Sequence, residues 1–166
     1  MFETEKYHFG IKKLNERSFL LPEEWFYSIS HREFLEPINQ PQLIDVVPEE
    51  IKKLFEVARG AIAYGYFFYP LLSLGSEQLF RVLDTATSIK CSELGAPQGV
   101  SNFARQFEWL KAQNIISSEH DDLWFAYKEL RNSTSHPKYQ QILSYPQVLK
   151  LINSIVRTVN DLFSQC

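Results

Sequence analysis

The side chains best suited to chemistry lie together in one short segment, residues 128–139, which read KELRNSTSHPKY. This segment carries three formal positive charges against one negative, although the whole chain is net acidic, with a charge of −3. Arg131, Asn132 and His136 contribute a guanidinium, an amide and an imidazole, and such groups together suit a phosphate group. We therefore expect a phosphate-binding site on these three residues. Further candidate binding residues in the same segment are Lys128, Lys138 and Tyr139.

The spacing of these residues places them on adjoining faces of a helix. Arg131 and His136 are about 140° apart on an ideal helix, whereas Asn132 and His136, four residues apart, share a face, so that Asn132 can orient the imidazole. Pro137 is expected to end this helix near His136. The negative end of the helix dipole then favours the imidazolium by a few tenths to about 1 kcal/mol. The structural alternative is that Arg131 and His136 only bond free carbonyls at the end of the helix.

Other kinds of catalytic or cofactor site have no support in the sequence. It contains no G-x-x-x-x-G-K-[ST] phosphate loop, no G-x-G-x-x-G turn, no H-x-x-x-H zinc pair and no G-x-S-x-G elbow. Its histidines are scattered, so a metal site would have to be assembled entirely by the fold; they are His8, His31, His120 and His136. We predict neither a metal nor a cofactor.

The elements that must position the segment are predicted to be helices. From Val47 onward the apolar residues recur every three or four positions, which is typical of amphipathic helices. The third helix is expected to turn Val100, Phe103, Ala104, Phe107 and Leu110 inward. The predicted helices are one between Pro48 and Pro70, then about 71–92, 100–113 and 118–136, and one from near Pro146. This pattern predicts an all-α fold, a bundle of four or five helices.

Residues 1–46 differ from this helical pattern. Pro22, Pro37 and Pro41 are expected to break up regular structure there. We therefore expect two parts: an N-terminal arm over 1–46, extended or forming a short hairpin and packed on the body, and a helical bundle over 47–166.

Composition favours a cytoplasmic globular protein. The 166 residues are 45% hydrophobic and 22% charged, and their aromatic share of 14% excludes disorder as the main state. A pI near 5.8 argues against a broad basic footprint for nucleic acid. The chain has no long apolar run and begins with charges rather than an export signal, so we expect no contact with a membrane. Cys91 and Cys166 are expected to be reduced thiols.

The string Arg131-Asn132-Ser133-Thr134-Ser135-His136 resembles the R-x4–6-H motif of the HEPN superfamily, the higher eukaryotes and prokaryotes nucleotide-binding domain. Members of this family are helical bundles with the motif toward the end of a late helix and a polar residue, commonly Asn, directly after the arginine. The resemblance covers roughly residues 47–166. Some toxin-type relatives carry a tyrosine two residues after the histidine, where this chain has Lys138, followed by Tyr139.

The resemblance implies metal-independent RNA cleavage in a cleft that two motifs form across a homodimer. His136 would act as general base on the ribose 2′-OH or as acid on the leaving 5′-oxygen. Arg131 would hold the scissile phosphate and stabilise its developing charge, and Asn132 would orient His136 or bond the phosphate. Lys128, Lys138 and Tyr139 would contact the RNA. The implied setting is defence or toxin–antitoxin activity, with an antitoxin-like protein as a further partner.

Two alternatives stay open at the level of the sequence. One is a non-catalytic HEPN-like interaction module that binds a protein partner or a nucleotide. The other is a helical scaffold without phosphate chemistry, in which the motif match is accidental. A cheap observation separates these readings from the ribonuclease: whether Arg131, Asn132 and His136 open onto a shared groove or point into the chain's own core.

Overall fold

The computed structural model describes residues 15–16, 18–117, 121, 123–125, 127 and 143–164. These residues form helices and connecting segments and contain no strand, which confirms the predicted all-α class for this part of the chain. The elements in chain order are η1 (Glu24–Phe26), α1 (His31–Asn39), α2 (Glu49–Tyr64), α3 (Leu71–Glu93), α4 (Phe103–Ala112) and α6 (Tyr145–Ser164). None of the helices in the described part is both long enough and apolar enough to cross a bilayer.

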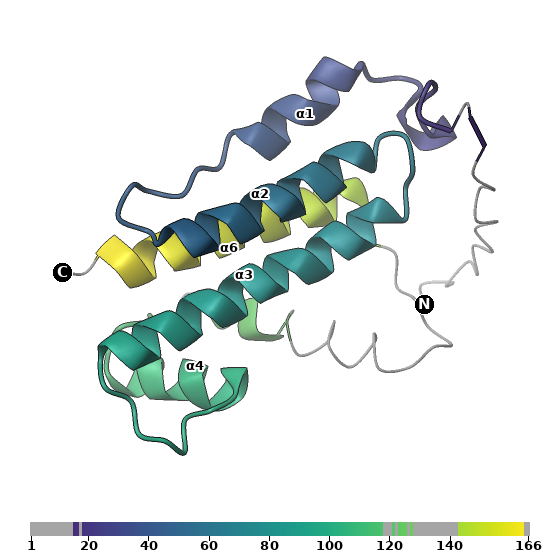
Figure 1. Ribbon diagram of the computed structural model, residues 1–166. Helices are drawn as coiled ribbons and strands as arrows, with labels where there is room; N and C mark the ends of the chain where they lie inside the picture. The colour runs from purple at the N-terminus through teal and green to yellow at the C-terminus, as the bar shows by residue number, and fades with distance from the viewer. Residues whose placement is uncertain are drawn as a thin grey trace, which may run out of the picture.

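Helices α2 and α3 form an antiparallel hairpin, and α6 lies against it, so that these three helices make the centre of the molecule (Figure 1). Gly75 of α3 allows the close approach of α2, because a Cβ atom there would meet the Ile62 side chain and would lie 3.1 Å from the carbonyl oxygen of Ala58. The core is built from apolar faces of all three helices. Its fully buried members include Phe55, Ile62, Leu72, Leu79, Leu83, Ile152 and Ile155.

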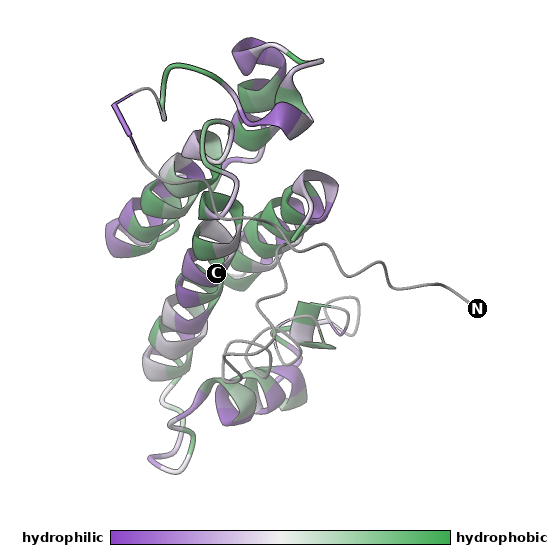
Figure 2. Ribbon diagram, turned by 90° about the vertical axis from the view of Figure 1, so that its right-hand side faces the viewer, coloured by the Kyte–Doolittle hydropathy of each residue, from purple (hydrophilic) through white to green (hydrophobic). Residues whose placement is uncertain are grey.

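The long helices are amphipathic, as the spacing of their apolar residues predicts. Figure 2 shows hydrophobic and hydrophilic residues alternating around their turns. The predicted start of α2 is confirmed: Pro48 precedes it, and Glu49 and Glu50 occupy the first turn, where acidic side chains favour the helix dipole. α3 spans Leu71–Glu93, one residue longer than expected. After α4, Asn114 adopts the left-handed conformation expected of it, with φ of 58°.

The expectation of an extended or hairpin arm is wrong for residues 31–39, which form α1 although Pro37 lies inside it. A capping box holds its first turn, because Ser30 Oγ accepts from the Glu33 amide at 3.2 Å and the Glu33 carboxylate accepts from the Ser30 amide at 2.7 Å. A proline in a helix costs about 3 kcal/mol. Phe34 and Ile38 are both fully buried, and each such burial contributes about 1.5–3 kcal/mol, which offsets that cost.

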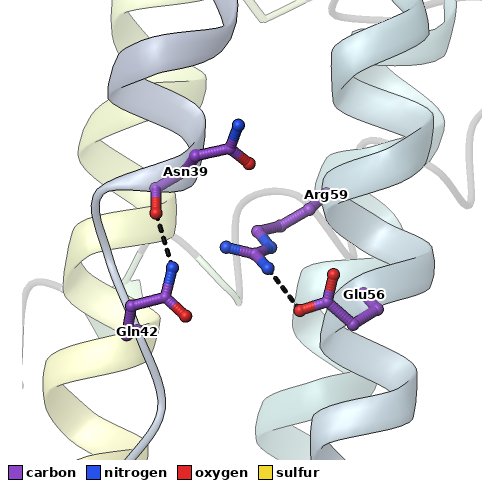
Figure 3. A network of polar contacts seen from close by, with 4 residues as sticks. All are labelled: Asn39, Gln42, Glu56 and Arg59. Carbon is purple, nitrogen blue, oxygen red and sulfur yellow. Dashed lines mark hydrogen bonds and ion pairs between the residues drawn. The ribbon is translucent and has the colours of Figure 1, made fainter.

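The segment that joins α1 to α2 is held from both sides. Asn160 of α6 accepts from the Ile44 amide at 3.0 Å and donates to the Gln42 carbonyl at 2.9 Å. Gln42 in turn donates to the carbonyl of Asn39, at the end of α1, at 2.6 Å (Figure 3). On the α2 side Lys52 donates to the Asp45 carbonyl of this segment at 2.8 Å, and Arg59, which pairs with Glu56, points toward it. The segment between α1 and α2, which belongs to the predicted N-terminal arm, is therefore packed on the helical body.

Candidate functional site

The sequence-predicted site lies outside the described residues. These positions are Lys128, Arg131, Asn132, His136, Lys138 and Tyr139. The last described residue before them is Tyr127, which directly precedes Lys128 in the chain. Since consecutive Cα atoms are about 3.8 Å apart, the Cα atom of Arg131 lies within about 15 Å of that of Tyr127 in any conformation.

Tyr127 is fixed against α3 by a polar contact. Its hydroxyl donates to the carboxylate of Asp84, with the two carboxylate oxygens at 3.1 and 3.3 Å. Tyr127 is 6% exposed and Asp84 is half-buried. A hydrogen bond to a charged acceptor in such a partly buried place contributes more than one between neutral groups. This contact ties the chain just before the motif to the middle of the molecule.

Aromatic packing holds the same stretch against α4. The Tyr127 ring lies 4.1 Å from that of Phe103 and 5.2 Å from that of Phe80, measured between centroids. Trp124 stacks on Phe107 at 5.3 Å with 11° between the planes. Residues 121, 123–125 and 127 are helical, which agrees with a fourth predicted helix over this described portion. α3, α4 and this helical stretch thus meet around one cluster of rings.

A cleft of about 340 Å³ opens beside Tyr127, between α3 and the start of α4, and its size lies within the range of small-molecule sites. Its walls carry mostly polar side chains. The lining residues are Asp84, Ser88, Ser101, Asn102, Phe103, Gln106 and Tyr127. A larger hollow of about 640 Å³ runs along α1. We take the smaller cleft as the candidate site, because one of its lining residues, Tyr127, directly precedes the motif segment in the chain.

Gln106 is a buried polar side chain in this cleft, at 8% exposure. One end of its carboxamide contacts the Thr87 hydroxyl at 3.3 Å, and that hydroxyl also donates to the main-chain carbonyl of Asp84 at 3.0 Å. A carboxamide has a donor at one end and an acceptor at the other. The Gln106 side chain also lines the cleft.

The start of α4 shapes the opposite wall. Asn102 caps this helix, because its side-chain oxygen accepts from the Arg105 amide at 3.0 Å. At the other end of α4, Lys111 pairs with Asp121 at 2.6 Å, and this hydrogen bond raises the pKa of the Lys111 amine above its ordinary value. α4 is therefore fixed at both ends. Within the described part of the chain, no three His, Cys, Asp or Glu side chains are grouped as metal ligands.

The sequence reading missed two residues of this cleft, Asp84 and Gln106. It expected Ala104 to face inward, which is wrong: Ala104 is exposed and Gln106 is buried. Both Gln106 and Phe107 fall on the helical face that Phe103 and Leu110 share, so a glutamine at an apolar position was the available signal. Polar groups at such positions are buried at a cost unless they find partners.

No family model, no curated protein and no solved structure matches this chain in the three comparisons that were made.

Proposed function

We propose that this chain is a HEPN-like helical protein whose Arg131–His136 motif binds an RNA phosphate and cleaves the RNA without a metal ion, in a site completed by a second copy of the chain. The observation that carries the proposal is the motif itself, which follows an anchored residue, Tyr127, closely in the chain. The string RNSTSH follows Tyr127 by only four residues, and Tyr127 is hydrogen-bonded to Asp84 in the wall of a polar cleft.

The anchoring of Tyr127 supports this function because phosphate chemistry requires positioned groups. A side chain that acts as acid or base must lie within hydrogen-bond reach of the proton it transfers. Residues in a helix are held more accurately than residues in a loop. The helical stretch that includes Tyr127 is packed on α3 and α4, where the Tyr127 ring contacts Phe80 and Phe103. It therefore provides a rigid start for the chain that carries the motif.

In the proposed reaction the RNA supplies its own nucleophile. His136 removes the proton from a ribose 2′-OH, which attacks the adjacent phosphorus while the bond to the 5′-oxygen of the next nucleotide breaks. Arg131 stabilises the additional negative charge on the phosphate in the transition state. The leaving 5′-oxygen takes up a proton from the imidazolium of the second copy. The products are a 2′,3′-cyclic phosphate and a 5′-hydroxyl, and DNA, which lacks the 2′-OH, is not cleaved.

The test is RNA cleavage in excess EDTA by the wild type and by the His136→Ala variant. We expect the wild type to leave cyclic phosphate ends and the variant to lose at least a hundredfold in rate, as general acid–base catalysis contributes about 10²–10⁴-fold. His31→Ala is the matched control, because His31 is an exposed histidine of α1. That control should cleave at the wild-type rate.

Two results would contradict the ribonuclease. One is a folded, dimeric wild type that cleaves none of a varied set of RNAs. The other is cleavage that His136→Ala and Arg131→Ala leave unchanged, which would place the activity in another part of the chain or in a contaminant.

A second candidate function is a non-catalytic HEPN-like module that binds a protein partner, and one observation favours it. Apolar side chains gather at high exposure around η1: Leu20, before it, is 72% exposed, Trp25, within it, is 59% exposed, and Tyr27, directly after it, is 64% exposed. Exposed apolar residues that cluster in one place are typical of interaction surfaces. The same cleavage assay separates the two functions, since a folded wild type without activity on RNA leaves the interaction module as the better account.

A further inference from the structure

We infer that two copies of this chain associate through the outer face of α2, with Gly60 at the point where the two α2 helices cross. This face consists of Val57, Gly60, Ala61 and Tyr64, which follow one another at helical spacing. The inference deepens the proposed function and rests on it in one respect, the need for a second copy. It names the surface of that association, which the Arg131–His136 motif does not specify.

Gly60 has no role in the packing of a single chain. It lies inside α2, where glycine lowers helix stability relative to alanine, because it loses more backbone freedom on folding. Gly75 of α3 also lies inside a helix, but a Cβ atom there would collide with the Ile62 side chain, so close packing requires that glycine. A Cβ atom at Gly60 would meet nothing within 4 Å. The approach of a helix from a second copy would require a glycine at this position, as the approach of α2 does at Gly75.

Large apolar side chains lie on either side of Gly60 and are exposed to solvent. Val57, three positions before it, is 60% exposed, and Tyr64, four positions after it, is 58% exposed. The apolar surface continues beyond the end of α2, because the Phe19 ring lies 6.3 Å from that of Tyr64. Phe19 is 48% exposed and the adjacent Leu20 is 72% exposed. α1 and α3 flank α2 and α6 lies behind it, so the described helices leave one side of α2 uncovered (Figure 1).

The size of this surface fits what a stable dimer needs. The exposed parts of these four large side chains provide on the order of 400 Å² of apolar area, since one large aromatic side chain can bury about 150–250 Å². A standard interface takes about 800 Å² from each partner, and somewhat more than half of it is apolar. The apolar surface at α2 is therefore close to the apolar share of one side of such an interface.

A second copy of the same chain suits this face because its charges are balanced. A two-fold dimer brings the same patch of both copies together, so a patch with a single sign of charge would repel its copy. Glu56, at the edge of the face, pairs with Arg59. Toward the start of α2, the exposed Glu50 and Lys53 carry opposite charges. A small residue between two bulky ones is also self-complementary, because the bulky side chains of one copy fit beside the glycine of the other.

The test is the association state of the full chain, measured by sedimentation velocity over a range of concentrations. We expect the wild type to show a monomer–dimer equilibrium. Gly60→Ala should raise the dimer dissociation constant at least tenfold, because the added methyl groups hold the two helices apart. The same substitution should raise the melting temperature of the dilute monomer by about 2–4 °C, since alanine is the better helix former. Weaker association together with a more stable chain identifies a close approach at Gly60.

A charged variant and two matched controls complete the series. Tyr64→Glu places a charge on the exposed face and should raise the dissociation constant at least a hundredfold. Gly99→Ala is the control for the glycine, because Gly99 is also exposed and a Cβ atom there meets nothing within 4 Å. Phe125→Glu is the control for the charge, at an aromatic side chain that is 66% exposed. Both controls should dimerise as the wild type does.

The inference is overturned if the wild type stays monomeric up to about 100 μM. It is equally overturned if either Gly60→Ala or Tyr64→Glu dimerises as tightly as the wild type. RNA cleavage is measured separately on the same proteins. Dimerisation through α2 without cleavage rejects the nuclease alone, whereas cleavage by a chain whose dimer persists in both variants rejects the α2 surface alone.

Discussion

Two clusters of aromatic rings lie at different places in this molecule and differ in the polar groups around them. The first, here called the α1 cluster, consists of Phe26, Phe34, Tyr66 and Tyr145, with the rings of Phe34 and Tyr145 4.2 Å apart. The second, the α4 cluster, consists of Phe103, Phe107, Trp124 and Tyr127, with the rings of Phe103 and Tyr127 4.1 Å apart. Ring types and ring spacing are similar in both.

The clusters differ in what accepts the tyrosine hydroxyls. In the α1 cluster these acceptors are main-chain carbonyls: Tyr66 donates to Ile29 at 2.9 Å and Tyr145 to Phe34 at 2.6 Å. Burial raises the pKa of Tyr145 to about 12. In the α4 cluster Tyr127 donates to a carboxylate, and a polar cleft adjoins it. Similar rings therefore close a core in one place and border a polar cleft in the other, and the polar residues beside them make the difference.

The largest expected change in unfolding free energy comes from a substitution that disrupts the α1 cluster. Phe34→Ala removes a fully buried ring that packs on Phe26 and Tyr145, and such a loss costs about 3–5 kcal/mol of unfolding free energy. Urea denaturation measures this quantity. Tyr27→Ala, at a side chain 64% exposed, should change it by less than about 0.5 kcal/mol. Similar losses in the two variants would show that α1 is not part of the core.

A smaller loss of stability is expected when one tyrosine hydroxyl is removed from each cluster, and the two losses can be compared. Tyr127→Phe removes a hydrogen bond to a charged acceptor and should cost about 1.5–3 kcal/mol, whereas Tyr145→Phe removes one to a neutral carbonyl and should cost about 0.5–1.5 kcal/mol. Both substitutions leave the ring in place. Urea denaturation at pH 7 gives the two values, and the reverse order would reject the distinction drawn between the clusters.

The smallest effect concerns the surface ion pair at the end of α4. Lys111→Gln removes the contact with Asp121, which is solvent-exposed, so we expect only a slight loss of stability that disappears in about 1 M salt. The pKa of Lys111 is raised in the folded state, so the stabilisation is complete at neutral pH and is lost only as the pH rises above 10.5. A loss that persists in high salt would mean that α4 depends on Lys111 for packing.

Much of the helical framework could be predicted from local signals. Pro48 with Glu49 and Glu50 marked the start of α2, and the spacing of apolar residues placed α3 almost to the residue. α4 begins at Phe103, later than the expected position near Val100, because Asn102 caps it. These features are local, since caps and periodicity act within a few residues.

α1 and the cleft could not be predicted in the same way. Pro37 argues locally against a helix, and only the burial of Phe34 and Ile38 against distant residues outweighs it. Asp84, Gln106 and Tyr127 are far apart in the sequence, and only packing brings them to one cleft. The Arg131–His136 motif is still a prediction, because its residues lie outside the described part of the chain.

The sequence alone determined the class of this protein, the positions of its long helices and the candidate phosphate-binding motif, because periodicity, caps and short motifs are written in neighbouring residues. Tertiary structure decided which polar residues meet. Thr87 and Gln106 come from different helices and contact each other only because α3 and α4 pack together, and the Asp84–Tyr127 contact likewise joins residues 43 positions apart. Burial energy selects such pairings over the whole chain, and no local pattern records them.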